Sequence, residues 1–354
     1  MQLSIEEKER YSRHIILTGF GEEAQLKLKK ARVLVIGAGG LGCPALLYLA
    51  AAGVGFIGIA DYDVVTLSNL QRQILYTVAD IGTHKAIAAS KQLSLLNNEI
   101  HINTFIEKVS VSNVFSIIEG YDLIIDGSDN FSTRYLLNDA CAIKTKPLVY
   151  GAIFKYEGQV SVFNLEEGPT YRCLFPSPPN ASEILSCNEI GVLGILPGIV
   201  GAWQAAEAIK VITGIGQPLK GALMSFDVLN NQANFFKFSP VATNKSISQL
   251  GEYDFDCSIA ADEIDAPTLK LWLTKKPVQL IDVREPQEYD EFNIGGRHFP
   301  LSGLHKRLQE IDHTKLTVVH CQTGVRSKKG IDIIKTCYPD INIFNLKNGL
   351  KDFA

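Results

Sequence analysis

The sequence lacks the cysteine pattern of a secreted, disulfide-bonded protein. Its 354 residues contain seven cysteines, an odd number, and no two of them form a C-x-x-C pair. Scattered thiols of this kind are typical of a reducing compartment, so we expect a cytoplasmic protein with free thiols. The polar, acidic N-terminal stretch MQLSIEEKERYSRH also differs from a signal peptide.

Strong net charge and long hydrophobic runs are also missing. The formal net charge is −4 and there is no long basic run, which argues against nucleic acid as a partner. The longest apolar stretch, residues 45–60, is rich in glycine and ends at Asp61. It therefore predicts a helix and a buried strand, and we expect no membrane span.

The length and the hydrophobic pattern predict two α/β domains. A chain of 354 residues is too long for one ordinary core. Residues 1–239 predict a doubly wound, Rossmann-like mixed sheet whose last strands are antiparallel. Residues 240–263 lose this periodicity and predict a linker. Residues 264–354 return to alternating strands and helices, which predicts a small α/β domain with a parallel sheet.

A glycine-rich turn organises the first domain. Residues 33–36 are apolar without alternation, as in a strand covered on both faces, and Gly37, Gly39 and Gly42 follow as G-x-G-x-x-G before a helical run. Bare backbone and a helix N-terminus can receive a phosphate. Asp61 ends the next strand about 20 residues later, where mononucleotide folds place a ribose-binding carboxylate. We favour a nucleotide site over a tight turn that only needs glycine.

Polar residues also stand at the ends of other expected elements. Asn69 and Arg72 lie in the loop DYDVVTLSNLQRQILY. Lys85 opens a helix, where it is either paired with an anion or simply solvated. Asp129 and Asn130 follow a strand at the sheet edge that binds ligands in α/β folds. Asp129 either holds a metal–phosphate complex or caps the next helix.

Two cysteines are candidates for chemistry. Cys187 precedes an apolar helix, where a thiol pKa is lowered, and a small buried residue is the alternative. Cys321 begins the loop CQTGVRS at the end of a strand. The loop backbone, the helix dipole and Arg326 would stabilise a thiolate or a persulfide there. With Gly324 and Ser327 also in place, a reactive persulfide loop is favoured over a structural cysteine.

Several motifs occur together and in order. The first 240 residues contain GAGGLG (37–42), DYDVVTLSNLQRQ (61–73), Lys85, DGSDNFSTRYLLN (126–138) and SCNEIGVLGILPG (186–198). The last stretch of about 90 residues contains IDVREPQEY (281–289), CQTGVRS (321–327) and NLKNGLKDF (345–353). The first set resembles the MoeB/ThiF-type adenylyltransferases, relatives of ubiquitin-activating enzymes, and the second resembles a rhodanese domain. The order is similar to that of fused molybdopterin-synthase adenylyltransferase/sulfurtransferases.

The resemblance implies ATP and Mg²⁺ as cofactors. Asp61 would bind the ribose, Asp129 would coordinate Mg²⁺, and the catalytic Arg72 and Lys85 would hold the triphosphate. Arg13, by its position alone a surface cation, would reach across a homodimer interface into the partner's site. The residues expected at the nucleotide are Gly37, Gly39, Gly40, Gly42, Asp61, Ser68, Asn69, Arg72, Lys85, Asp129 and Asn130.

The implied substrate is a ubiquitin-like sulfur-carrier protein that ends in Gly-Gly. Its terminal carboxylate would attack the α-phosphate of ATP, giving an acyl-adenylate and pyrophosphate through positioning and charge neutralisation. Cys321 would carry a persulfide supplied by a donor such as a cysteine desulfurase. Cys187 would resolve an acyl-disulfide or accept a thioester. The product would be a carrier thiocarboxylate for molybdopterin, thiamine or another sulfur-containing product.

Two features depart from the patterns of these families. The adenylyltransferases usually bind a structural zinc through two C-x-x-C pairs, but here Thr170 replaces one cysteine, Cys173 remains, and residues 238–246 contain none. One thiolate cannot form a tetrahedral site, so we expect no zinc. Rhodanese domains often have a histidine where this chain has Asn293.

Other functions remain as alternatives. An NAD-dependent oxidoreductase would need a proton-relay residue and a nicotinamide pocket, and no motif indicates either. The first domain could be a nucleotide-binding scaffold, with a separate thiosulfate sulfurtransferase or a regulatory domain behind it. Four residues (322–325) separate Cys321 from Arg326, whereas the corresponding loop of related phosphatases contains one residue more. The shorter loop favours sulfur transfer. An activator of a ubiquitin-like modifier for protein conjugation would not need a sulfur donor.

Overall fold

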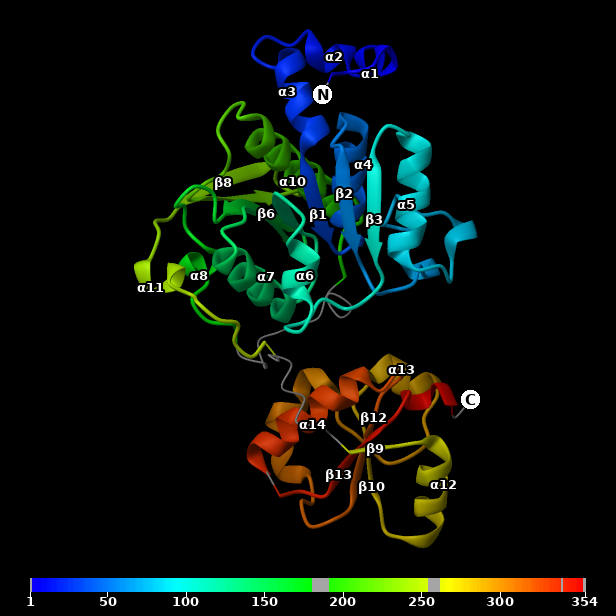
Figure 1. Cartoon of the computed structure of the whole chain (residues 1–354). Coiled ribbons are helices and arrows are strands. Elements are labelled where there is room, and N and C mark those ends of the chain that lie inside the picture. The colour runs from blue at the N-terminus through cyan, green and yellow to red at the C-terminus, as the bar shows by residue number, and fades with distance from the viewer. Residues whose placement is uncertain (1, 180–190, 254–261, 339, 353–354) are drawn as a thin grey trace. The chain divides into compact units, whose positions relative to one another are not determined.

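The chain forms two compact units, residues 1–255 and 256–354 (Figure 1). The structure, a computed structural model, describes residues 2–179, 191–253, 262–338 and 340–352. Each unit has its own sheet and its own hydrophobic cores, which confirms the expected pair of α/β folds.

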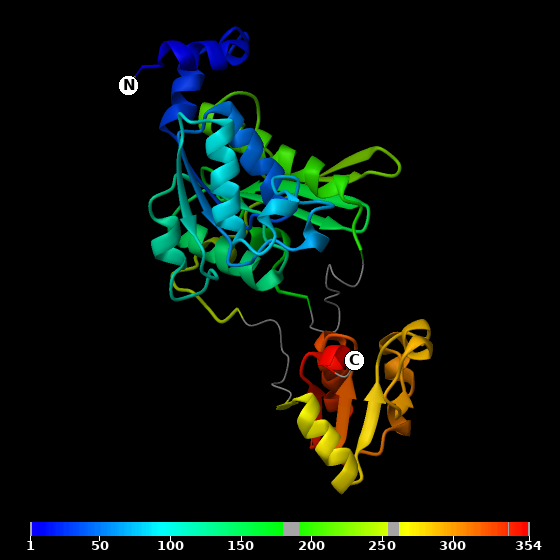
Figure 2. The ribbon, with the colours of Figure 1, turned by 90° about the vertical axis from the view of Figure 1, so that its right-hand side faces the viewer.

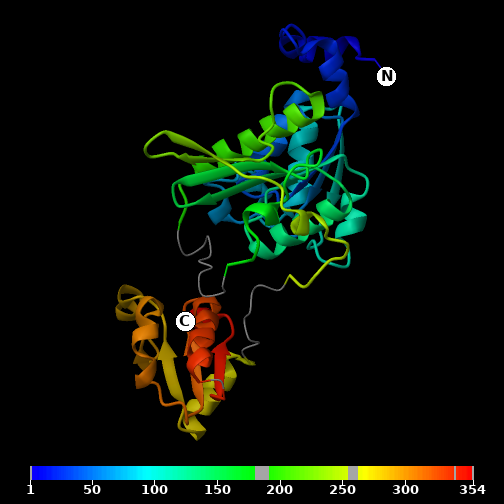
Figure 3. The ribbon, with the colours of Figure 1, turned by 90° about the vertical axis from the view of Figure 1, so that its left-hand side faces the viewer.

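The first unit contains an eight-stranded sheet in the order β3-β2-β1-β4-β5-β6-β7-β8. The first five strands in this order are parallel, and the remaining strands continue the sheet antiparallel. The last two strands form a hairpin, β7–β8, with Asn231 at φ +53° in its turn (Figure 3). The strands are β1 Arg32–Ile36, β2 Phe56–Ala60, β3 His101–Phe105, β4 Leu123–Asp126, β5 Leu148–Phe154, β6 Glu157–Phe163, β7 Ala222–Asp227 and β8 Gln232–Lys237.

Helices cover both faces of this sheet (Figures 2 and 3). Val33 and Val35 of β1 belong to one core, whereas Leu34 and Ile36 belong to the core on the other face. Burial on both sides explains why β1 is apolar without alternation. The helices are α1 Ile5–Arg10, α2 Ser12–Ile15, α3 Gly21–Lys30, α4 Gly42–Ala52, α5 Lys85–Leu96, α6 Val114–Ile118, α7 Phe131–Ile143, α8 Tyr171–Leu174, α10 Ile195–Thr213 and α11 Ala242–Lys245.

Within the described residues, α10 is the one helix whose length and composition would allow it to cross a membrane. Its residues Leu196 and Val200 are buried against β6, and Ala205 and Ala208 belong to the core that α4 lines. This burial is typical of a core helix in a globular domain.

The predicted linker, residues 240–263, differs from what the structure shows. Residues 242–245 form α11, and the Asn244 side-chain amide donates to the carbonyl of Arg172 at 3.0 Å. Tyr253 is buried, and its hydroxyl donates to Asp139 Oδ2 at 2.7 Å. These polar contacts hold a segment without periodicity on the first unit, which hydrophobic patterning alone could not reveal. At the other end, residues 262–264 already belong to the second sheet.

The second unit contains a five-stranded sheet in the order β11-β10-β12-β13-β9, and all its strand pairs are parallel, as predicted. Its strands are β9 Asp262–Ile264, β10 Gln279–Asp282, β11 Arg297–His298, β12 Thr317–His320 and β13 Ile343–Leu346. Its helices are α12 Ala266–Lys275, α13 Pro286–Glu291 and α14 Val325–Cys337.

His320, the last residue of β12, is fully buried, and neither nitrogen of its ring has a hydrogen-bond partner in the described part of the chain. Burial lowers its pKa to about 4, and the carboxylate of Asp282, 3.8 Å from Nδ1, offsets this only in part. The ring is therefore neutral in the folded protein at pH values where an unfolded chain would protonate it.

This difference predicts acid sensitivity of the second unit. Between pH 6.5 and 4 the unfolded state binds a proton at His320 and the folded state does not, so stability falls as the pH is lowered through this window, by up to about 3 kcal/mol. Urea unfolding followed by Trp272 fluorescence, in a Trp203→Phe background, measures it. His320→Leu should flatten the pH dependence, and an unchanged slope would contradict this explanation.

Candidate functional site

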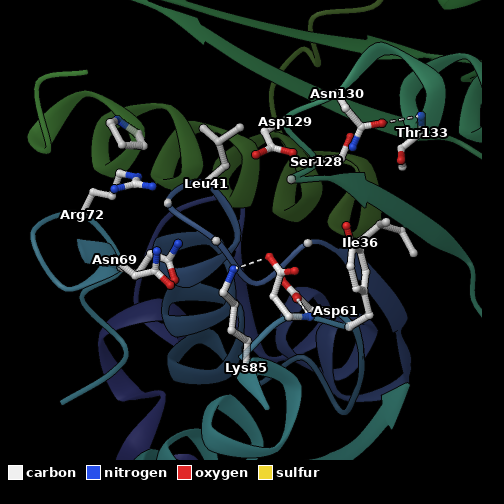
Figure 4. Close-up of a pocket in the computed structure, with 18 of the residues that line it drawn as sticks. Ile36, Leu41, Asp61, Asn69, Arg72, Lys85, Ser128, Asp129, Asn130 and Thr133 are labelled. Atoms are coloured by element: carbon white, nitrogen blue, oxygen red, sulfur yellow. Dashed lines mark hydrogen bonds and ion pairs between the residues drawn. The ribbon is translucent and has the colours of Figure 1, made fainter. Parts of the chain in front are cut away.

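A cavity of about 480 Å³ opens where β1, β2 and β4 end (Figure 4). This is the carboxyl edge of the parallel strands, where α/β folds bind ligands. Most residues predicted at the nucleotide lie together in its wall: Gly37, Gly39, Gly40, Asp61, Asn69, Arg72, Lys85, Asp129 and Asn130. Gly42 and Ser68 do not line it.

Two glycines allow the turn after β1 to pack against its neighbours. Gly37 has φ +90°, and a Cβ there would lie 2.6 Å from the carbonyl oxygen of Gly127, in the loop after β4. A Cβ at Gly42 would lie 1.9 Å from the carbonyl oxygen of Gly37. Gly42 thus permits α4 to begin directly against the turn, so its role is close packing rather than contact with a ligand.

Asp61 holds this turn through its backbone. Its Oδ2 accepts a hydrogen bond from the Ala38 N–H at 2.7 Å, and its Oδ1 accepts one from the Asp63 N–H at 2.8 Å. Burial raises the pKa of Asp61, while the charge of Lys85 acts in the opposite direction. Asp61 therefore orders the glycine turn and also faces the cavity.

Tyr76 is a positioning residue that the sequence did not reveal. Its buried hydroxyl donates to the Ala38 carbonyl at 2.7 Å and lies 3.3 Å from the carbonyl of Lys85. Tyr76 thus connects the glycine turn to the beginning of α5. No local pattern marks a tyrosine in a loop for such a role, since both partners are backbone atoms distant in the sequence.

Two cations enter the cavity from the segment between β2 and α5. Lys85 is buried at the start of α5, and its Nζ lies 2.7 Å from Asp63 Oδ2. It is therefore not a solvated lysine, because burying an ammonium group is costly unless it is paired. The guanidinium of Arg72 donates to the carbonyl of Ser68 at 3.1 Å. The Ser68 side chain itself is exposed and contacts Thr66, so the prediction that it faces the nucleotide differs from the structure.

Asp129 and Asn130 have different roles at the start of α7 (Figure 4). Asn130 Oδ1 accepts a hydrogen bond from the Thr133 N–H at 2.8 Å, so Asn130 is the helix cap. Asp129 is exposed at the cavity, and no side-chain hydrogen bond or ion pair engages it among the described residues. Its carboxylate is free to bind a hard cation such as Mg²⁺.

Arg13 is exposed on α2 and does not line the cavity of its own chain. Cys187 falls outside the described residues.

Hydrogen bonds join the segments where the resemblance would place zinc. Cys173 Sγ lies 3.3 Å from the Thr170 hydroxyl and accepts a hydrogen bond from the Val241 N–H at 3.2 Å. Among the described residues there is no group of three or more His, Cys, Asp or Glu side chains that could hold a metal ion. The contact between α8 and the segment at α11 therefore rests on this polar cluster.

Cys321 lies directly after β12, fully buried, with its Sγ 3.5 Å from the Ser327 hydroxyl. Gly324, at φ +84°, turns the chain into α14. The guanidinium of Arg326 makes a bidentate ion pair with Glu288, at 2.6 and 2.5 Å, which raises the pKa of Arg326. Glu288 therefore engages the guanidinium of Arg326, and Cys321 acts on it only through the charge interaction between the two groups. Asn293 is exposed and its amide donates to the Tyr289 carbonyl.

Comparisons with known proteins agree with this architecture. The chain matches the ThiF family over residues 11–248 and the rhodanese-like domain over residues 265–354. It is 43% identical to the probable adenylyltransferase/sulfurtransferase MoeZ of Mycobacterium tuberculosis, over 94% of this chain and 89% of that protein. It is 38% identical to the probable molybdopterin-synthase adenylyltransferase of Porphyra purpurea, over 99% of this chain and 94% of that protein.

Two further comparisons concern the first unit. The sulfur carrier protein adenylyltransferase of Thermus thermophilus is 49% identical over 68% of this chain and 89% of its own length. A crystal structure of E. coli MccB with ATP superposes with a TM-score of 0.60 at 21% identity, over 68% of this chain and 74% of that one. At this identity the likeness concerns the fold.

The packing of the glycine turn predicts a contrast between two alanine variants. Gly37→Ala should lower the free energy of unfolding by about 2–4 kcal/mol, because the new methyl group meets the Gly127 backbone at a strained φ. Gly39→Ala is the matched control, since its nearest neighbour would be 3.7 Å away. Urea unfolding followed by Trp203, in a Trp272→Phe background, measures both. Equal stability of the two variants would contradict this packing.

Proposed function

Because the chain belongs to the ThiF family and ends in a rhodanese-like domain, we propose that it activates a ubiquitin-like sulfur-carrier protein and converts it to a thiocarboxylate. The observation that carries this proposal is the cavity that gathers a glycine turn, an ordered carboxylate, two cations and a free carboxylate at one sheet edge. The names of the relatives, which join adenylyltransferase and sulfurtransferase, support it.

The charges that line this cavity suit ATP. The backbone of the glycine turn and the start of α4 receive phosphate, and Asp61 faces the place of the ribose. Arg72 and Lys85 neutralise the triphosphate, and Lys85 then exchanges Asp63 for a phosphate oxygen. Asp129 would hold Mg²⁺, which would neutralise charge that develops on the phosphates.

Adenylation needs no protein nucleophile. A terminal carboxylate oxygen of the carrier forms a bond to the α-phosphorus while the bond to the β-phosphate oxygen breaks, so the products are acyl-adenylate and pyrophosphate. The protein contributes in-line positioning and neutralisation of like charges.

Sulfur transfer follows at Cys321. Its persulfide, supplied by a sulfur donor such as a cysteine desulfurase, attacks the acyl carbonyl, and AMP leaves. Attack of the Cys187 thiolate on the resulting acyl-disulfide would form a disulfide with Cys321 and release the thiocarboxylate. The alternative for Cys187 is a transient thioester. The thiocarboxylate would serve molybdopterin or thiamine formation.

Exchange of pyrophosphate into ATP tests the adenylation step. With Mg²⁺ and a carrier that ends in Gly-Gly, we expect exchange that disappears when this dipeptide is removed. Cys321→Ser is the matched control, since it should leave exchange unchanged and abolish thiocarboxylate formation. If none of the carriers that end in Gly-Gly supports exchange, although the protein is folded and binds ATP, the result would favour the alternative of a nucleotide-binding scaffold. If exchange occurs but the carrier never gains sulfur, the result would favour the alternative of an enzyme that activates a ubiquitin-like modifier for protein conjugation.

Arg13 provides a test of the proposed homodimer. If it completes the site of the partner subunit, inactive Arg13→Ala and inactive Lys85→Met protomers should together form mixed dimers with one complete site, recovering about a quarter of the normal exchange rate. Mixing Asp129→Asn with Lys85→Met is the control, because both residues line one cavity and no complete site results. Absence of recovery in the first mixture would refute a role across the interface.

A further inference from the structure

Arg134 of α7 lies where the cavity of the candidate site meets a second cavity of about 320 Å³, and it lines both. Only 11% of its side chain is exposed. Aromatic rings form much of the wall of the second cavity: Phe131, Tyr150, Tyr171 and Phe175. The guanidinium carbon lies 5.5 Å from the ring centres of both Phe131 and Tyr150.

The pairing of this buried cation is incomplete. Its Nε lies 3.9 Å from Asp126 Oδ2, and neither atom has a hydrogen-bond partner among the described residues. The other oxygen of Asp126 accepts hydrogen bonds from the backbone and the hydroxyl of Ser128. Buried charges are normally paired and hydrogen-bonded, and one that is not calls for an explanation such as a bound ligand.

The proposed reaction brings an anion to this place. A carrier carboxylate must approach a triphosphate near Asp129, so it needs a cation that is not already occupied by the phosphates. Figure 4 shows Arg72 and Lys85 on the side of the cavity opposite Ser128 and Asn130. Arg134 belongs to the same helix that Asn130 caps, and its guanidinium donates to the Ser128 carbonyl at 3.3 Å.

We propose that Arg134 binds the C-terminal carboxylate of the carrier protein, and that the second cavity holds the extended chain just before it. This inference rests on the proposed function. A guanidinium group matches a carboxylate in shape and can donate two parallel hydrogen bonds. The rings of Phe131 and Tyr150 lie beside the group and exclude water, which strengthens the pairing. Arg134 would thus distinguish a free C-terminus from a blocked one.

The test compares two forms of one carrier, ending in a carboxylate or in a carboxamide. Calorimetry measures their binding to the full-length protein in the presence of a non-hydrolysable ATP analogue. The wild-type protein should prefer the carboxylate by at least about tenfold, the worth of one charge-assisted hydrogen bond. Arg134→Gln should lose this preference, and Arg134→Lys should keep part of it. Affinity for the ATP analogue should change less than about twofold.

Lys155→Gln is the matched control, because Lys155 also lines the second cavity but does not reach the first. It should retain the preference for the carboxylate. A preference that persists in Arg134→Gln would overturn the inference and leave Arg134 as a structural partner of Asp126. If Arg134→Gln does not fold, a full wild-type preference in Arg134→Lys would overturn it as well.

The wild-type result separates this inference from the proposed function. Binding of both carriers without preference would overturn the role of Arg134 alone. Binding of neither carrier would overturn the proposed function, and the inference with it.

Discussion

The candidate site depends on the contact between two loop backbones, at Gly37 and Gly127. Their approach leaves no room for a Cβ and brings the turn after β1 against the loop after β4. Asp61 and Tyr76 then hold Ala38 between them, one at its N–H and the other at its carbonyl. The positions of these loops place the side chains that face the cavity. The geometry of the site therefore depends on a backbone conformation that only glycine permits.

The site also contains two buried cations, and each has an acidic partner. Lys85 is paired with Asp63, which is half exposed, so a phosphate can replace the carboxylate without leaving a buried charge alone. The ion pair of Arg134 and Asp126 is long, and Arg134 Nε and Asp126 Oδ2 have no hydrogen-bond partner among the described residues. We propose that the guanidinium binds a substrate carboxylate with its free donors. In the proposed reaction, the anionic nucleotide and the anionic carboxylate would thus each have their own cation in one cavity.

Much of this architecture could be predicted from the sequence, for identifiable reasons. The apolar run of β1, the glycine turn and Asp61 are local patterns, and parallel strands bring their carboxyl ends to one edge. The roles of Tyr76 and Arg134 could not be predicted, because they depend on how loops and strands pack in space. Tyr76 contacts two backbone carbonyls, and Arg134 lies beside Asp126 at the end of β4 and Tyr150 of β5. The predicted linker is too long, because Asn244 forms two hydrogen bonds to the α8 segment and Tyr253 packs in the core while its hydroxyl donates to Asp139. These isolated contacts leave no periodic pattern in the sequence.

The central claim is that one chain both activates a carrier and supplies its sulfur. The most direct measurement is the intact mass of a Gly-Gly-terminated carrier after incubation with this protein, ATP, Mg²⁺ and a persulfide donor. We predict that one oxygen of the carrier is replaced by sulfur, only when ATP is present and Cys321 is intact. A carrier that is adenylated but never gains sulfur, with the persulfide verified on Cys321, would contradict the account.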